Sequence, residues 1–487
     1  MLTCSLIFLP VLAALLFFVV PEASAKRVAF IASLAEFAVA IVAYITYKSD
    51  PSSASLSCKM PWIGAMNANW HVAIDGISML MVLLTTLLVP FILLSSFAKN
   101  FANPKAFYAL VLTMQAALIG VFTAMDGFLF YVFWELALIP IYFICLLWGG
   151  EGRAKITFKF FIYTLFGSLF MLAALIYLYI HADHSWNVQD LYAAGKSLNG
   201  SEQTWIFWAL FLAFGIKMPI FPLHTWQPDT YTNAPTQGTM LLSGIMLKMG
   251  TYGLIRWLIP MVPVGMAWNS KYAIALSVIS VVYASCIAIA QKDFKRMIAY
   301  SSIAHVGLIS AGIMANNIEG VQGGLIQMMS HGINVVALFY IFDLLQSRMQ
   351  TSEMRMMGGI RGVAPQFALL FLIVLLGSVA MPLTNGFVGE FLLLNGIFQH
   401  NIWMAAAAGL TVILGAVYML RGYQTMMLGE TNERTNTFTD LTNTEKWVLI
   451  PLAILIIVFG IYPKPLLDLT ADHVQVLVNG VQAIGAK

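Results

Sequence analysis

Long apolar runs recur along almost the whole chain and are separated by short polar segments. The runs are about 18–25 residues long, which is the length an α-helix needs to cross a hydrocarbon layer about 30 Å thick. They lack the alternation of apolar and polar residues that is typical of a barrel strand. The pattern therefore predicts an all-α, polytopic membrane protein.

Hydropathy leads us to expect about 14 transmembrane helices. Their approximate limits are 2–20, 28–47, 73–97, 106–125, 127–148, 156–181, 204–223, 235–259, 272–290, 297–316, 321–346, 366–397, 402–424 and 446–463. The longer connections cover 48–72, 182–203 and 425–445. None of them is long enough for a soluble domain that would hold a cofactor.

The composition agrees with a membrane protein. Of the 487 residues, 60% are hydrophobic and only 10% are charged, whereas soluble domains are about one quarter charged. The net charge of +3 is too small to indicate a nucleic-acid partner. The four cysteines, Cys4, Cys58, Cys145 and Cys286, show no CxxC or Cys/His spacing. We therefore expect no metal ion and no iron–sulfur cluster bound by this chain alone.

The first apolar run ends in Ala23-Ser24-Ala25, which imitates a signal-peptidase site. No positively charged region precedes the run, so we expect a retained first span, with cleavage as the alternative. Most of the 25 lysines and arginines lie in loops that follow odd-numbered spans. The positive-inside rule makes those loops cytoplasmic. Both termini are then expected on the outer side of the membrane.

Six ionisable residues lie inside expected spans, where such groups are costly and mark functional sites by default. They are Glu135, Lys217, Lys248, His305, His331 and Glu390. Taken singly, a lysine can extend to an interface, a histidine can bond a neighbouring helix and a glutamate can line a water-filled vestibule. Together these carboxylates, amines and imidazoles indicate a chain of groups that passes a proton, and they suit neither a metal cage nor a hydrolytic triad.

Prolines interrupt two of the expected spans beside these residues. Pro219 and Pro222 follow Lys217 in span 7, and Pro382 precedes Glu390 in span 12. Broken membrane helices free backbone carbonyls, admit water and mark ion sites in transporters built from repeats. The two breaks predict two five-helix repeats, spans 4–8 and 9–13. Because five is odd, the second repeat is inverted. Two unrelated proline kinks are the alternative.

These repeats give a predicted division of the chain into four parts. An N-terminal three-helix segment covers 1–100, and the first repeat covers 101–260. The inverted second repeat covers 261–425, and a C-terminal helix and tail cover 426–487.

Four long motifs show a family resemblance. They are FWELALIPIYF (133–143), GIKMPIFPLHTWQPD (215–229), APTQGTMLLSGIMLKMGTYGLIR (234–256) and QKDFKRMIAYSSIAHVG (291–307). They resemble the antiporter-like, proton-pumping subunits of respiratory complex I, and the same motifs occur in Mrp-type antiporters and membrane-bound hydrogenases. The resemblance extends over roughly residues 70–425. In this superfamily, a glutamate at position 390 favours complex I over the Mrp relatives, which more often carry lysine there.

The resemblance implies a membrane subunit of NADH:quinone oxidoreductase that translocates protons. FMN, the iron–sulfur clusters and quinone are then expected in other subunits, with no cofactor bound by this chain. The implied partners are the other membrane subunits, including two homologous antiporter-like chains, and the lipid bilayer. An Mrp-type cation/proton antiporter, a hydrogenase subunit and a membrane scaffold that moves no proton are the alternatives.

The resemblance also implies roles for the six residues. Glu135 is the expected partner of Lys217, and Lys248 is the expected central relay. His305 and His331 would continue the route to the terminal group, Glu390. In this hypothesis Lys217 holds its proton while Glu135 is near and releases it when Glu135 moves away.

One position departs from the family pattern. Many relatives carry a histidine where this chain has Tyr231, so no role of that histidine is transferred. His224, earlier in the same motif, is a weak substitute.

Overall fold

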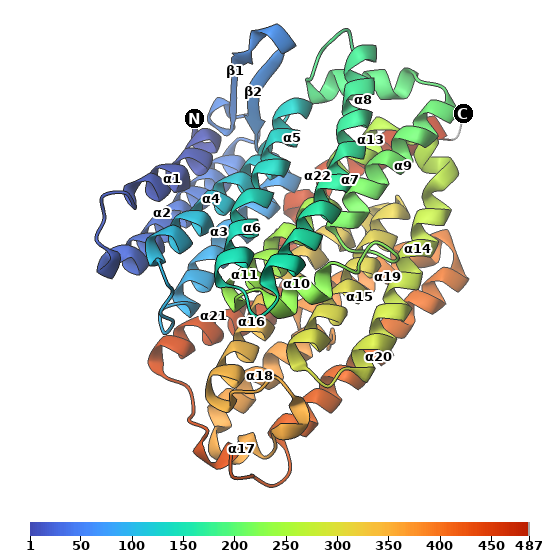
Figure 1. Ribbon diagram of the computed structural model, residues 1–487. Helices are drawn as coiled ribbons and strands as arrows, with labels where there is room; N and C mark the ends of the chain where they lie inside the picture. Colours follow the sequence, from blue (N-terminus) through green and yellow to red (C-terminus); the bar gives the residue numbers. More distant parts are fainter. Residues whose placement is uncertain (486–487) are drawn as a thin grey trace. The chain divides into compact units, whose positions relative to one another are not determined.

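The computed structural model describes residues 1–485, which fold mainly into α-helices (Figure 1). The chain divides into two compact units. Unit 1 comprises Met1–Met218, Ile245–Ala273 and Asp468–Lys487, and unit 2 comprises Pro219–Gly244 and Ile274–Leu467. The elements η3 (Leu242–Met246), α14 (Pro263–Ala290) and α22 (Lys464–Gly485) are each divided between the two.

Unit 1 contains helices and a two-stranded sheet. Its elements are α1 (Leu2–Leu16), α2 (Glu22–Ser49), η1 (Ala54–Leu56), β1 (Ser57–Ile63), η2 (Gly64–Met66), β2 (Ala68–Ala73), α3 (Gly76–Ser95), α4 (Pro104–Thr123), α5 (Gly127–Leu136), α6 (Leu138–Trp148), α7 (Arg153–His181), α8 (Val188–Ser197), α9 (Gly200–Lys217), α12 (Leu247–Gly253), η4 (Leu254–Leu258) and α13 (Ile259–Met261).

Unit 2 is helical throughout its described elements. They are α10 (Gln227–Asn233), α11 (Thr236–Leu241), α15 (Phe294–Met314), α16 (Ile318–Met349), η5 (Met354–Met356), α17 (Ile360–Val363), α18 (Pro365–Ser378), α19 (Asn385–His400), α20 (Ile402–Met427), η6 (Thr435–Thr437) and α21 (Asn443–Ile461). Among the ten candidate spans, the most deeply buried is α16, which packs against α15, α18, α19 and α21.

Ten helices among residues 1–485 are long and apolar enough to cross a membrane. They match ten of the expected spans. The four others lie at 2–20, 204–223, 235–259 and 366–397. The expected span 2–20 forms only the 15-residue helix α1, and the helix within the expected span 204–223 ends at Lys217. The last two are divided into shorter helical segments. The count of 14 therefore stays a prediction, and the structure supports a multi-pass helical protein.

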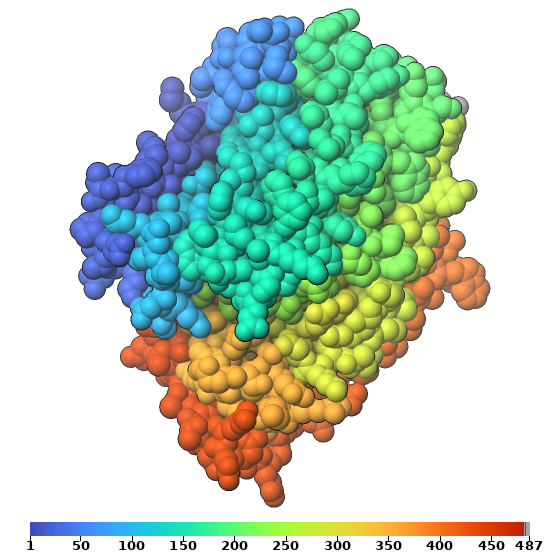
Figure 2. Space-filling model, viewed as in Figure 1, coloured from blue at the N-terminus to red at the C-terminus, as the bar shows by residue number. Residues whose placement is uncertain are grey.

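The outer face of α7 is apolar, as a lipid-facing helix requires. Phe158, Phe166, Leu169 and Ile180 are all more than half exposed. In Figure 2 the teal residues of this helix form a broad surface that faces the viewer. Exposed side chains of this size suit a hydrocarbon environment and not water.

A β-hairpin corrects the expectation that the chain is entirely α-helical. Within the expected loop 48–72, β1 and β2 pair antiparallel, with Cys58 opposite Val72 and Met60 opposite Trp70. Polar and apolar residues alternate along most of both strands, so a search for continuous apolar runs does not detect them. Aromatic packing supports the hairpin, because the Trp70 ring stacks on Phe8 with 5.3 Å between centroids.

The C-terminal tail is also more ordered than expected. Residues beyond the last expected span form the amphipathic helix α22. Its apolar residues recur every three or four positions, and Val474, Val478 and Val481 are buried. This spacing predicts one apolar helical face. A search for apolar runs misses such a helix, because its polar face lowers the average hydropathy.

Close packing of α9 against α12 leads to a stability prediction. A Cβ at Gly250 would lie 2.7 Å from the Phe214 carbonyl oxygen and 3.0 Å from the Met218 Cβ. Gly250→Ala is therefore expected to destabilise unit 1 by about 1–3 kcal/mol, as overpacking generally does. Gly409→Ala is the matched control, because nothing lies within 4 Å of its Cβ position. Thermal aggregation in detergent measures the difference, and equal midpoints for the two variants would contradict the prediction.

Candidate functional site

Glu135 lies at the centre of an apolar span. It is the penultimate residue of α5, and the chain continues through Ala137 into α6. Its carboxylate is within hydrogen-bond reach of the Ser168 hydroxyl on α7. The Oε1 atom has no hydrogen-bond partner among the described residues. The carboxylate is therefore held by a weak neutral partner that a charged group can replace.

Lys217 is the last residue of α9 and is only 2% exposed. Its Nζ has no hydrogen-bond partner within residues 1–485 and lies 5.3 Å from the centroid of the Trp134 ring. Glu135 acts on Lys217 electrostatically, but the two form no hydrogen bond. The structure thus brings the expected partners into one unit and shows them separated, with Trp134 facing the amine.

Lys248 is 1% exposed and lies in α12. Two π-helical segments, η3 and η4, flank this seven-residue helix. π-Helical turns inside α-helices occur frequently at functional sites, because the extra residue shifts the register of the side chains that follow. The helix that holds Lys248 also packs on α9, which holds Lys217. Glu135, Lys217 and Lys248 therefore all belong to unit 1.

His305 and Glu390 form a buried pair in unit 2. The Nε2 atom of His305 on α15 lies 3.3 Å from Oε1 of Glu390 on α19. The same nitrogen lies 3.1 Å from the Ser378 carbonyl oxygen, and Nδ1 lies 2.8 Å from the Ser301 carbonyl oxygen. Both ring nitrogens thus face acceptors. An imidazole with a proton on each nitrogen satisfies this arrangement.

The helix break positions this pair. Helix α18 ends at Ser378, and α19 begins only at Asn385. The interruption leaves the Ser378 carbonyl without its helical donor, and His305 supplies one. Gln327 from α16 also lies 3.5 Å from Glu390. The break near Pro382 that the sequence predicts therefore creates the acceptor that holds His305.

His331 lies next to this pair. Its ring centroid is 5.8 Å from that of His305, and its Nε2 is 3.1 Å from the Ser302 hydroxyl. Both imidazoles line a cavity of about 10 Å³. Such a volume is near the minimum that one water molecule needs. One small polar cavity therefore borders both imidazole rings.

The motif that follows Lys217 lies in unit 2. His224 is 4% exposed, and its ring packs 5.2 Å from that of Tyr283. Tyr231 on α10 is fully buried against Phe339, with 5.9 Å between ring centroids. No described ring contact joins either residue to His305 or His331; each packs instead against at least one aromatic ring.

Lys295 and Glu36 are two of the buried ionisable residues that escaped the sequence reasoning, beside Asp126 and Asp343. Lys295, which lies in the charged stretch before the expected span 297–316, donates to the Ala234 carbonyl at 2.7 Å and is 5% exposed. Glu36 on α2 is fully buried, and neither of its carboxylate oxygens has a hydrogen-bond partner in the described part of the chain. Glu36 carried the same signal as Glu135, an acidic residue within an apolar run, and was overlooked. Lys295 gave no such signal, because it follows a cluster of charged residues.

No group of three or more His, Cys, Asp or Glu side chains with the spacing of a metal site occurs among the described residues. Cys145 lies in α6 and Cys286 in α14, whereas Cys4 and Cys58 are within hydrogen-bond reach of each other.

The chain has extensive similarity to known membrane proteins. The NADH:quinone oxidoreductase/Mrp antiporter transmembrane family matches residues 124–415. NADH-quinone oxidoreductase subunit M of Rickettsia conorii is 40% identical over 481 residues, which cover 97% of each chain. A chain of respiratory complex I from Thermus thermophilus with bound NADH superposes with a TM-score of 0.89 at 30% identity. The match covers 98% of this chain and 100% of that one.

A more distant likeness concerns the fold alone. A chain of the Mrp complex from Dietzia has a TM-score of 0.85 at 16% identity, and the match covers all of this chain and 55% of that one. The family match over more than half of the chain and the 40% identity along nearly its whole length decide the assignment. This chain belongs to the NADH:quinone oxidoreductase/Mrp antiporter family of membrane proteins.

Proposed function

We propose that this chain is a proton-translocating membrane subunit of an NADH:quinone oxidoreductase. The observation that carries the proposal is the His305–Glu390 pair, in which a buried imidazole faces acceptors with both nitrogens. A group in this setting can take up and pass on a proton without leaving the interior. The similarity to subunit M of Rickettsia conorii supports a role as a complex I subunit over a role as an Mrp-type antiporter.

In unit 1, the proposed proton carriers are Lys217 and Lys248, and Glu135 is the switch. A carboxylate that moves from Ser168 toward Lys217 stabilises the ammonium, because opposite charges attract strongly where water is scarce. When the carboxylate returns, the ammonium loses that stabilisation and its proton moves on. The observed arrangement, with Lys217 facing Trp134, corresponds to the separated position of the switch.

In unit 2, the proton passes from His331 to His305 and then to Glu390. The 5.8 Å between the two imidazole centroids and the cavity beside them suit transfer through one water molecule. Glu390 is the terminal group and releases the proton to the outer side or to a neighbouring subunit. The broken helix serves this step, because its free carbonyl orients His305 toward the carboxylate.

The proposed architecture has 14 spans and two inverted five-helix repeats, at 101–260 and 261–425. An N-terminal segment covers 1–100, and a C-terminal segment covers 426–487. Breaks near Lys217 and Glu390, one in each proposed repeat, support this division. The distribution of lysine and arginine supports a periplasmic location for both termini.

The electrons are proposed to come from elsewhere in the complex. FMN, the iron–sulfur clusters and quinone belong to other subunits in this proposal. Partners are the other membrane subunits, including two homologous antiporter-like chains, and lipid. Coupling then reaches this chain through its contacts with neighbours.

A substitution at Lys248 tests the proposal. Lys248→Met keeps an unbranched side chain that is only one heavy atom shorter and removes the amine, so proton pumping is expected to fall about tenfold or more, as loss of a proton-transfer group does. Met249→Leu is the matched control at an adjacent, fully buried position. Pumping driven by NADH in membrane vesicles is compared with NADH:ferricyanide activity, which reports assembly alone. Normal pumping by a fully assembled Lys248→Met complex would refute the route.

A further inference from the structure

A column of polar side chains continues from Lys248 toward one end of unit 1. Tyr252 follows Lys248 by four residues and Arg256 follows Tyr252 by four, so the three share one helix face. The Tyr252 hydroxyl donates to the Phe122 carbonyl at 2.9 Å and accepts from Arg256 Nε at 3.2 Å. These groups form a hydrogen-bonded link that starts one turn from Lys248.

Arg256 ends the column in an ion pair. Its Nη2 lies 2.5 Å from the Oδ2 of Asp75, which precedes α3, and 3.3 Å from the Ser78 hydroxyl. The Tyr192 hydroxyl donates to the Arg256 carbonyl at 2.5 Å. Although burial by itself raises the pKa of Asp75, the Arg256 charge and the hydrogen bonds hold that pKa at about 2. The pair is therefore fully ionised at neutral pH.

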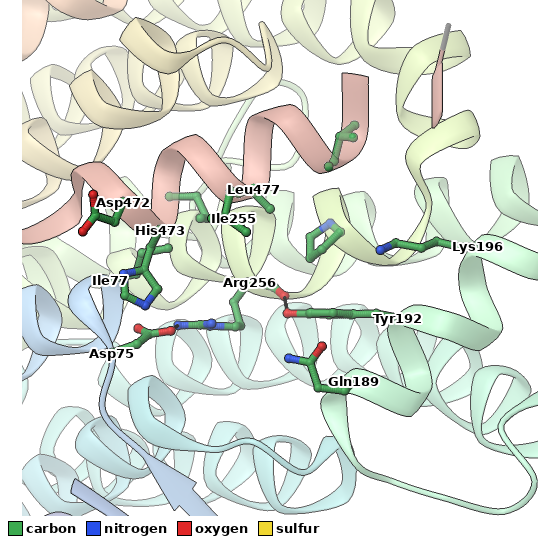
Figure 3. Close-up of a pocket in the computed structure, with 14 residues that line it drawn as sticks. Asp75, Ile77, Gln189, Tyr192, Lys196, Ile255, Arg256, Asp472, His473 and Leu477 are labelled. Atoms are coloured by element: carbon green, nitrogen blue, oxygen red, sulfur yellow. Dashed lines mark hydrogen bonds and ion pairs between the residues drawn. The ribbon is translucent and has the colours of Figure 1, made fainter. Parts of the chain in front are cut away.

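Beyond the pair lies a cleft of about 530 Å³ that has both polar and apolar lining residues. Figure 3 shows the Arg256 side chain extending to Asp75, with His473 of α22 above Asp75 and Tyr192 on the opposite side of Arg256. Lys196 also lines this cleft. The Asp75–Arg256 pair therefore lies between the cleft and the Tyr252 column that leads to Lys248.

We propose that Arg256 is an electrostatic seal, a fixed positive charge that stops protons from passing between the cleft and Lys248 along the Tyr252 column. Guanidinium groups stay charged at every physiological pH, so the barrier is permanent. A fixed cation at a narrow point excludes protons, as arginine does in water channels. Asp75 holds the guanidinium in place. This inference rests on the proposed role of Lys248, because a lysine that carries protons has to be insulated from the cleft.

The test measures passive proton leak through the whole complex in liposomes, without NADH, after a step in external pH. Arg256→Gln is expected to raise the leak about tenfold, because a barrier of one nearby charge is lost. Asp75→Asn breaks the same ion pair but keeps the cation, so its leak is expected to stay at the native level. Arg256→Lys also keeps a cation, so its proton leak is expected to stay at the native level.

Two further variants complete the test. Asp75→Asn/Arg256→Gln removes both charges together, so no buried charge is left unpaired, and the same leak is expected. Adding Tyr252→Phe to Arg256→Gln is expected to suppress the leak, because the hydroxyl link is gone. A purely structural ion pair predicts that Asp75→Asn and Arg256→Gln behave alike, and that result would overturn the seal. A double variant whose proton leak stays at the native level would also overturn the seal. Pumping by Lys248→Met decides the proposed function separately, so the two proposals can fail independently.

Discussion

Replacing Lys217 by alanine is expected to lower proton pumping about tenfold or more, which is the usual effect of removing a group that transfers a proton. The amine is 2% exposed and has no hydrogen-bond partner among the described residues. Its charge therefore depends on Glu135 and on the ring of Trp134, 5.3 Å away.

Lys217→Arg separates charge from proton transfer. Arginine keeps the positive charge but does not release its proton, so this variant is expected to pump as poorly as Lys217→Ala. Glu135→Gln removes the switch and is expected to impair pumping as well. Lys155→Ala on the exposed start of α7 serves as the control. The measurement is NADH-driven acidification of membrane vesicles, normalised to NADH:ferricyanide activity. Native pumping by Lys217→Arg would disprove the switch.

Replacing Glu390 by glutamine is expected to have a comparable effect at the other end of the route. The substitution leaves the His305 imidazole without the carboxylate that lies 3.3 Å from its Nε2. Loss of one partner from a buried pair costs about 3–5 kcal/mol. Separately from this loss of stability, removal of the acid–base group is expected to lower pumping about tenfold or more.

Graded substitutions distinguish proton transfer from packing at this position. Glu390→Asp retains the carboxylate at a greater distance and is expected to pump better than Glu390→Gln. Glu433→Gln, in an exposed loop, is the control. Vesicle acidification is measured beside the amount of assembled complex in native gels. If Glu390→Asp and Glu390→Gln pump equally and both assemble normally, Glu390 does not carry the proton.

The sequence by itself determined the broad class of this protein. Hydropathy is enough for that, because a segment that crosses lipid has to be apolar over its whole length and to satisfy its own backbone. For the same reason an ionisable residue within such a segment stands out, and Glu135, Lys217 and Glu390 were found in this way. The helix breaks beside Lys217 and Glu390 were predicted because proline removes a backbone donor.

Only the tertiary structure decided which groups meet. The contact between His305 and Glu390 joins residues 85 positions apart and depends on how α15 packs against α19. The separation of Glu135 from Lys217 depends on the positions of their side chains, which hydropathy does not report. The hairpin and α22 are polar enough on one face to escape a search for apolar runs.

The Asp75–Arg256 pair shows the physical reason most clearly. Its members lie 181 residues apart, and in the sequence each looks like an ordinary charged residue near the end of a span. Packing in unit 1 places them together beside Tyr252 and the cleft. Apolarity along a chain is a local property that sequence displays directly. The pairing of charges depends on distances that exist only after the helices have packed.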